Sequence, residues 1–182
     1  MKTIKCIGIF ILVIVVAGFA YMYSGIYNVA ATAPDSALAQ WVLHTTRERS
    51  VESRSEDIQP PKGTSLSDPK LIDLGFRHYD EMCVMCHGAP GVEPGEAHAG
   101  LNPQPPDLAK HAKEMKPGEL FWVIKHGIRM TGMPAWGPTH SDHKIWAMVA
   151  FIKQLPHVSP QEYQQMRRTA AAHPMDEDEH SH

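Results

Sequence analysis

The sequence predicts an all-α protein with one transmembrane helix at its N-terminus. An almost uninterrupted apolar run extends from Cys6 to Tyr23. Beyond this run, apolar side chains recur at the three- and four-residue spacing of helices, and one such stretch begins with the helix-start signal Asp68-Pro69. No alternation of strand and helix patterns surrounds the cysteine pair in the middle of the chain, as a mixed α/β domain would require.

The N-terminal apolar run is long enough to cross a membrane. At 1.5 Å per residue, Cys6 to Tyr23 spans about 27 Å, which is close to the thickness of a bilayer core. A cleavable signal peptide usually has a shorter apolar region, of about 7 to 15 residues, so we expect a retained anchor. Lys2 and Lys5 precede the run and should stay in the cytoplasm. The rest of the chain would then lie in the periplasm, outside the bacterial inner membrane.

Composition changes along the chain predict its domain organisation. Two prolines at residues 60 and 61 end the segment that follows the anchor, and the last ten residues are polar. In that tail, a metal site formed by His173, His180 and His182 is the alternative to disorder. The expected parts are residues 1–5 (cytoplasmic basic end), 6–24 (anchor), 25–64 (juxtamembrane helix and linker), 65–157 (main domain) and 158–182 (short helix and disordered His/acidic tail).

Helices are expected at several places beyond the linker. One covers residues 69–82 and leads into the cysteine pair. Gly75 costs about 1 kcal/mol inside a helix relative to alanine, so it marks the close approach of another helix. Helices are also expected at residues 117–128 and 141–155, and the latter is the expected partner of Gly75. The sequence Ser-Pro-Gln-Glu at residues 159–162 has the form of a capping box and predicts a further short helix.

The most informative motif is C-x-x-C-H at residues 83–87. This pattern is the attachment signature of a c-type haem. On a helical turn, Cys83 and Cys86 lie over one side of the macrocycle, where their sulfurs can form thioethers with its two vinyl groups. His87 follows directly and comes up beneath the iron. The motif therefore predicts one covalently attached haem c.

Three other interpretations of the motif fit less well. A thioredoxin-like redox pair needs a strand–helix context, which this sequence does not offer. A structural zinc site needs a second pair of ligands, and the only other cysteine, Cys6, lies in the apolar run. A plain disulfide between Cys83 and Cys86 would leave His87 unexplained.

The segments after the motif predict a loop around the haem and a second protein ligand for its iron. Residues 88–106 are rich in glycine and proline and favour an irregular loop wrapped around a cofactor. Met133 precedes Pro134, which favours an extended backbone, and a thioether is a soft ligand suited to haem iron. We therefore expect Met133 to be the sixth iron ligand. Met130 and His126 are the alternatives.

These residues together resemble the class I monohaem cytochromes c, in particular membrane-anchored bacterial members similar to the cytochrome c subunits of respiratory oxidases. The resemblance implies the class I cytochrome c fold with crossed terminal helices around one covalent haem. It also implies that His87 and Met133 are the metal ligands, and that the carbonyl of Pro106 accepts a hydrogen bond from His87. The resemblance covers residues 68–155 and is based on Gly75 with Tyr79, Cys83 to His87, Pro106-Asp107-Leu108, Gly132-Met133-Pro134, and Met148 with Phe151.

The expected function is one-electron transfer. With both axial positions filled by protein, the iron has no open site for a substrate, so the chain would be an electron carrier without catalytic residues of its own. The resemblance implies a membrane-tethered carrier in a periplasmic respiratory chain, with redox proteins at the membrane as its partners. One alternative is a cytochrome subunit of a periplasmic dehydrogenase or terminal reductase complex. Another is a gas or peroxide sensor from whose iron Met133 dissociates.

The charge of the chain argues against nucleic acid as a partner. The whole sequence has 17 lysines and arginines against 20 acidic residues, and the acidic excess lies mostly in the tail. Between residues 69 and 158 the two signs balance. Nucleic-acid binding requires a basic patch, which a neutral domain of this kind does not predict.

Overall fold

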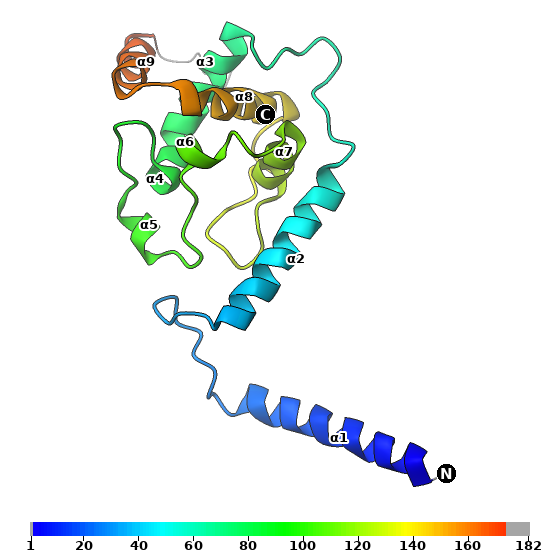
Figure 1. Cartoon of the computed structure of the whole chain (residues 1–182). Helices are drawn as coiled ribbons and strands as arrows, with labels where there is room; N and C mark the ends of the chain where they lie inside the picture. The colour runs from blue at the N-terminus through cyan, green and yellow to red at the C-terminus, as the bar shows by residue number, and fades with distance from the viewer. Residues whose placement is uncertain (1, 174–182) are drawn as a thin grey trace. The chain divides into compact units, whose positions relative to one another are not determined.

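The computed structural model describes residues 2–173 of the chain (Figure 1). Within that range the chain forms helices and no strand, apart from an isolated β-bridge between Ala89 and Val92. The prediction of an all-α protein is therefore confirmed. Contacts divide the chain into two units, of which the first ends at Asp35 and the second begins at Ser36. The expected disordered tail beyond residue 173 lies outside the described residues.

The first unit contains α1 (Lys2–Tyr23). From Thr3 to Tyr23 this helix is long and apolar enough to cross a membrane, and none of that stretch is buried against other parts of the chain. A signal sequence at an N-terminus meets the same criteria of length and composition. The choice of a retained anchor over a cleaved signal therefore stays a prediction.

The second unit begins with α2 (Ala37–Ser55), so the helix expected after the anchor belongs to this unit. The hydroxyl of Ser36 caps the helix by accepting a hydrogen bond from the backbone of Ala39 (3.2 Å). The far end of α2 lies against the start of α7 (Pro117–His126). A Cβ on Gly118 would come within 2.6 Å of the carbonyl oxygen of Ile58, so this approach requires glycine.

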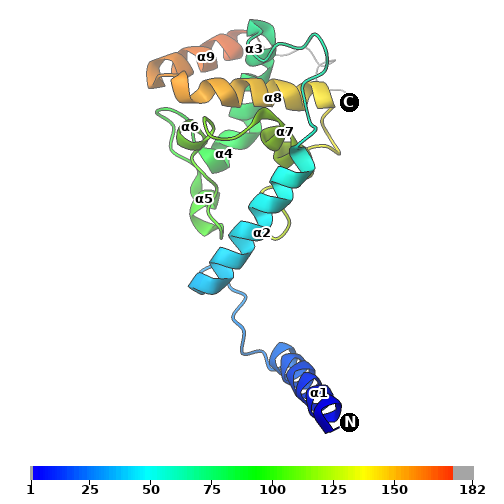
Figure 2. The ribbon, with the colours of Figure 1, turned by 45° about the vertical axis from the view of Figure 1, so that its right-hand side comes forward.

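Two crossed helices form the centre of the second unit: α3 (Pro69–His78) and α8 (Asp142–Gln154) (Figures 1 and 2). At the crossing, a Cβ on Gly75 would overlap the carbonyl oxygen of Ala147 and lie 3.0 Å from the Cβ of Phe151. The backbones can meet this closely only because residue 75 has no side chain. The predicted approach of the 141–155 helix to Gly75 is thus confirmed.

The hydrophobic core surrounds this crossing. Every residue of α8 from Lys144 to Ile152 is buried. Phe151 makes an edge-to-face contact with Phe76 (ring centroids 5.4 Å apart), and Trp146 stacks on Phe121 at 4.4 Å. Short elements complete the domain: η1 (Tyr79–Cys83, a π-helical turn), α4 (Val84–His87), α5 (Glu96–Gly100), α6 (Leu108–His111) and the 3₁₀ turn η2 (Leu155–His157).

A lysine side chain of α8, Lys153, binds carbonyl groups of the segment between α6 and α7. The ammonium group of Lys153 donates to the carbonyl oxygens of Ala112 (2.8 Å), Lys113 (3.3 Å) and Met115 (2.9 Å). A turn between two helices presents carbonyls that no helical N–H reaches, and Lys153 supplies the donors.

The last helix, α9 (Pro160–Ala172), begins with the predicted capping box. The hydroxyl of Ser159 accepts from the backbone N–H of Glu162 (3.3 Å), and the carboxylate of Glu162 accepts from the backbone N–H of Ser159 (2.7 Å). The helix is longer than the expected short segment, and it lies beside α3 (Figures 1 and 2). Its Tyr163 is fully buried and belongs to the core.

Candidate functional site

The C-x-x-C-H motif lies on two short helical segments of different type. Cys83 ends the π-turn η1, in which the N–H of Val84 donates to the carbonyl of Tyr79, five residues earlier. Cys86 and His87 belong to α4, which ends at Gly88 with φ 64°, a conformation that glycine adopts without strain. We expected an ordinary helix leading into the cysteines, so the π-turn is a feature that sequence reasoning missed.

Tyr79 closes the motif from within the core. Its hydroxyl donates to the carbonyl oxygen of Gly88 at 2.7 Å, so this side chain links the first residue of η1 to the residue after His87. Tyr79 is fully buried, and burial, followed by the nearby Cys83 and Asp107, raises its pKa well above the ordinary value. The phenol therefore stays protonated and remains a hydrogen-bond donor.

The two thiols of the motif are free. Burial, with a smaller effect of the neighbouring Cys86, raises the pKa of Cys83 to about 12. A dithiol that works by thiol–disulfide exchange needs the opposite, a lowered pKa that gives a thiolate near neutral pH. The environment of Cys83 therefore disfavours the thioredoxin-like interpretation.

His87 is held in a defined orientation by the backbone of the following loop. Its Nδ1 lies 2.8 Å from the carbonyl oxygen of Pro106. A carbonyl can only accept, so the proton lies on Nδ1 and the lone pair is left on Nε2. Burial lowers the pKa of His87; the bond to Pro106 acts in the other direction, and His98 lowers the pKa further. The neutral imidazole with a free Nε2 is the form that binds a metal.

A second histidine supports the motif and was not predicted. Nδ1 of His98 lies 2.7 Å from the carbonyl oxygen of Cys86, and the N–H of Gly95 donates to the carbonyl of Met85 at 2.8 Å. His98 belongs to α5, within the segment 88–106 that we expected to be irregular throughout. That expectation is wrong for residues 96–100. The stretch Glu-Ala-His-Ala contains no proline, and this was the available signal for a helical turn.

Met133 lies in a tight loop whose backbone is fixed. Its N–H donates to the hydroxyl oxygen of Thr131 (3.1 Å), and that hydroxyl donates to the carbonyl of Ile128 (2.8 Å). The N–H of Ile128 in turn donates to the carbonyl of Met133 (3.1 Å). A Cβ on Gly132 would lie 2.5 Å from a methyl group of Leu101, so the loop packs against the end of the segment that follows the motif.

The two alternatives to Met133 are placed differently. Met130 is 92% exposed and has a positive φ of 61°. His126 is an exposed residue of α7, where its ring lies 5.2 Å from that of Trp122. Met133, in contrast, is partly buried and packs against the main core cluster, as Cys83 does. Of the three candidates, only Met133 shares that cluster with the motif.

The residues that would surround a haem fit that group chemically. Cys83 and Cys86 offer two free thiols three positions apart, His87 offers a lone pair on Nε2, and Met133 offers a partly buried thioether. A c-type haem uses these types of group: two thiols for covalent attachment, and an imidazole and a thioether for its iron. All four residues, and Pro106, were named as candidates from the sequence, and their roles stay predictions.

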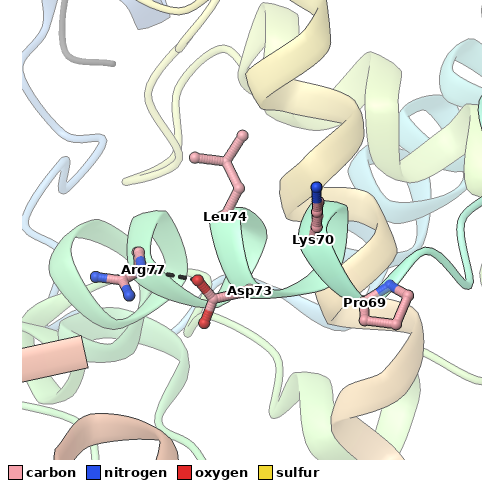
Figure 3. A pocket seen from close by; sticks show the side chains of 5 residues that line it. All are labelled: Pro69, Lys70, Asp73, Leu74 and Arg77. Atoms are coloured by element: carbon pink, nitrogen blue, oxygen red, sulfur yellow. Dashed lines mark hydrogen bonds and ion pairs between the residues drawn. The ribbon is translucent and has the colours of Figure 1, made fainter. Parts of the chain in front are cut away.

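A cavity on the outer side of α3 is separate from these residues. It has a volume of about 390 Å³ and is lined by Pro69, Lys70, Asp73, Leu74 and Arg77 (Figure 3). The carboxylate of Asp73 is paired with the guanidinium of Arg77 at 2.9 Å. The same guanidinium donates to the carbonyl of His173 at 2.6 Å. The charged groups of Asp73 and Arg77 are thus engaged within the chain, where they connect α3 to the end of α9.

The crossed helices and the C-x-x-C-H motif are typical of a c-type cytochrome domain. Residues 70–152 match the family model described as "Cytochrome C oxidase, cbb3-type, subunit III". This segment of the chain belongs to that family, and it is a class I cytochrome c domain of the oxidase type. Both the predicted fold and the predicted family are confirmed. No curated protein matches the chain.

This cytochrome c domain supports a haem c electron-transfer protein. The matched segment contains the motif, Pro106 and Met133, whereas α1, α2 and α9 lie outside it. These three helices are therefore parts of the chain that the family match does not describe.

Proposed function

We propose that the chain is a membrane-tethered cytochrome that carries single electrons in a periplasmic respiratory chain. One haem c would be attached through Cys83 and Cys86, with His87 and Met133 as the iron ligands. The observation that supports this proposal most strongly is the contact between His87 and Pro106. It leaves the lone pair on Nε2 of a histidine that directly follows two free cysteines in the sequence.

Each residue of the site has a defined task in this proposal. When bound, the haem supplies an iron that gains and loses one electron. Cys83, at the end of η1, and Cys86, in α4, would hold the haem covalently. Pro106 orients His87 and keeps its proton on Nδ1, and the hydrogen bonds of Thr131 hold the backbone of Met133. Because both axial donors come from the protein, no residue is needed to bind or activate a substrate.

The N-terminal helix supports the location in this proposal. A chain anchored by α1 stays within reach of membrane complexes, which raises its effective concentration near them. Lys2 and Lys5, at the start of α1, favour the orientation in which the haem domain lies in the periplasm, where covalent haem attachment is completed in bacteria.

A direct test is production of the full chain in a bacterium with a working haem-ligation apparatus. We expect a coloured membrane protein with covalently bound haem, oriented toward the periplasm, that titrates as a single one-electron centre. A colourless protein would contradict the haem site itself. Carbon monoxide binding to the reduced protein at neutral pH would instead support the sensor, because it requires Met133 to leave the iron.

One observation favours a second candidate, a cytochrome subunit of a dehydrogenase or terminal reductase complex. The first turns of α2 carry no charged side chain, and Leu38, Trp41 and Leu43 are 62–69% exposed there. An apolar helix surface of this kind suits contact with a membrane-embedded partner subunit. Purification in mild detergent separates the two candidates. A lone carrier should leave the membrane without stoichiometric companions, whereas a subunit should retain them and lose them on replacing Trp41 with glutamate.

Replacing Met133 with alanine should leave the haem attached but change its ligation. Attachment needs only the thiols, so we expect a haem-loaded protein with an altered absorption spectrum. Its reduction potential should fall by a sizeable part of the ~0.8 V range that axial ligands span, because a thioether ligand raises the potential. The absorption spectrum and a redox titration measure both effects.

Met130→Ala is the matched control, since it removes a thioether that is almost fully exposed. This variant should keep the parent spectrum and potential. An unchanged low-spin spectrum in Met133→Ala would transfer the role of sixth ligand to Met130 or His126.

A further inference from the structure

Helix α9 is attached to the segment that immediately precedes the haem motif. The hydroxyl of Tyr163 donates to one carboxylate oxygen of Asp80 (2.8 Å), and Nε of Arg167 donates to the other (3.1 Å). Tyr163 is fully buried, and the Asp80 side chain is only 23% exposed. Asp80 belongs to η1 and lies three residues before Cys83. Both oxygens of a partly buried carboxylate in the π-turn are therefore bound by α9.

The same helix also contacts the segment that follows the motif. Gly91 lies in the turn closed by the reciprocal backbone bonds of Ala89 and Val92 (2.8 and 2.9 Å). A Cβ on Gly91 would lie 2.8 Å from the Cβ of Pro160, the first residue of α9. This turn directly follows Gly88, whose carbonyl accepts the hydrogen bond from Tyr79. Helix α9 thus touches the chain on both sides of residues 83–87.

Helix α9 itself is fixed along its length. The ring of Tyr163 lies edge-to-face on Phe76 of α3, with centroids 5.4 Å apart. At the other end, the guanidinium of Arg77 donates to the carbonyls of Ala170 (3.4 Å) and His173 (2.6 Å). Helix α9 is therefore fixed to α3, beside which it lies in Figure 2, and it can restrain the segments that it touches.

A π-turn needs support of this kind. Its widened hydrogen-bonding pattern is rare and is seen mostly as single turns at functional sites. In η1 the turn is held from one side by the bond between Tyr79 and Gly88, and from the other by the two bonds to Asp80. Charge-assisted hydrogen bonds to a carboxylate are stronger than neutral ones, so the α9 contact contributes a large share of this restraint.

We propose that α9 is a positioning element of the haem site, which acts by holding the segment 79–91 through Asp80 and Gly91. In this role Tyr163 and Arg167 are positioning residues: they touch neither the thiols nor His87, and they act through Asp80. The role rests on the proposed haem ligation, and it concerns a helix outside the matched segment 70–152.

The test compares two neighbouring arginines in the full-length holoprotein. Arg167→Gln removes the charge that binds Asp80. Arg168→Gln is the control, because it makes the same change one position further along α9. Nη2 of the Arg168 guanidinium donates to Gln165 of the same helix (2.7 Å), so this substitution leaves Asp80 untouched. Tyr163→Phe is the third variant, since it removes only the hydroxyl and keeps the ring on Phe76.

The readouts are amide hydrogen exchange over residues 79–91 and the reduction potential. Arg167→Gln and Tyr163→Phe should accelerate exchange in that segment about fivefold or more, because each removes a charge-assisted bond that closes it. Both should also lower the potential relative to Arg168→Gln, since a looser segment admits water to the haem and water favours the more highly charged ferric state. The control should match the parent protein in both measurements.

Two results overturn the positioning role. One is faster exchange confined to α9, with residues 79–91 and the potential unchanged; the other is an equal effect of Arg167→Gln and Arg168→Gln. Arg167 is a surface residue, so this pair remains informative even if Tyr163→Phe does not fold. A parent chain that never acquires haem overturns the proposed function instead. The two failures are distinguishable, because the positioning role is judged only by comparing variants that carry haem.

Discussion

Replacing Cys86 with alanine should prevent the accumulation of a stable haem-loaded protein. The variant loses one of the two thioether bonds, and it loses the one adjacent to His87, whose position depends on it. A chain that folds around its cofactor loses stability when the cofactor is not retained. We therefore expect the yield of protein with covalent haem to fall roughly tenfold or more, measured by the absorbance and mass of the denatured protein.

Cys6→Ala provides the matched control, because it removes a thiol in α1, far along the sequence from the motif. That variant should bind haem like the parent. Full haem loading in Cys86→Ala would contradict the covalent attachment through both cysteines, and a loss in both variants would point to a general failure of export.

Replacing Gly75 with alanine should destabilise the domain by about 3 kcal/mol or more. The new methyl group would overlap the carbonyl oxygen of Ala147, and a backbone atom in the middle of a packed helix cannot move aside as a flexible side chain can. Helix α8 would have to shift away from α3, which would loosen the core around Phe151. Denaturant unfolding of the holoprotein measures the change in the free energy of unfolding.

Gly100→Ala shows what the same substitution does without the contact. A Cβ at residue 100 would meet nothing within 4 Å, and this glycine is also helical. Helix propensity alone favours alanine over glycine by about 1 kcal/mol, so this variant should be as stable as the parent or more stable. Equal effects of the two substitutions would contradict the tight crossing of α3 and α8.

The main helices could be predicted from the sequence because their signals are local. Asp68 followed by Pro69, and the capping box at Ser159 and Glu162, are start signals that act within one turn, and the structure confirms both. The partner of Gly75 was also predictable, since a glycine inside an amphipathic helix has few explanations other than close packing.

The support of the haem motif could not be predicted in the same way. The π-turn at residues 79–83 is stabilised by contacts with Gly88 and α9, of which the second is about eighty residues away in sequence. Short-range patterns carry no information on such contacts. The bond from His98 to Cys86 was missed for a related reason: its helix, α5, is too short to show a periodic pattern.

The candidate site itself was predicted more completely than its surroundings. Cys83, Cys86 and His87 form one contiguous motif, and a methionine before proline stands out in a glycine-rich stretch. The structure adds that Met130 and His126 are exposed whereas Met133 packs against the core. This difference depends on how the 127–134 loop folds back on the core, which local sequence patterns do not reveal.

The contact of Lys153 with three carbonyls of the segment 112–115 has a consequence for how the domain unfolds. The turn at residues 112–115 has three of its carbonyls bound by an ammonium group on α8, so it loses these hydrogen bonds when that helix detaches. Residues 112–115 and α8 should therefore unfold together. The segment between α6 and α7 lies at the surface, but we expect it to resist proteolysis as well as α8 does.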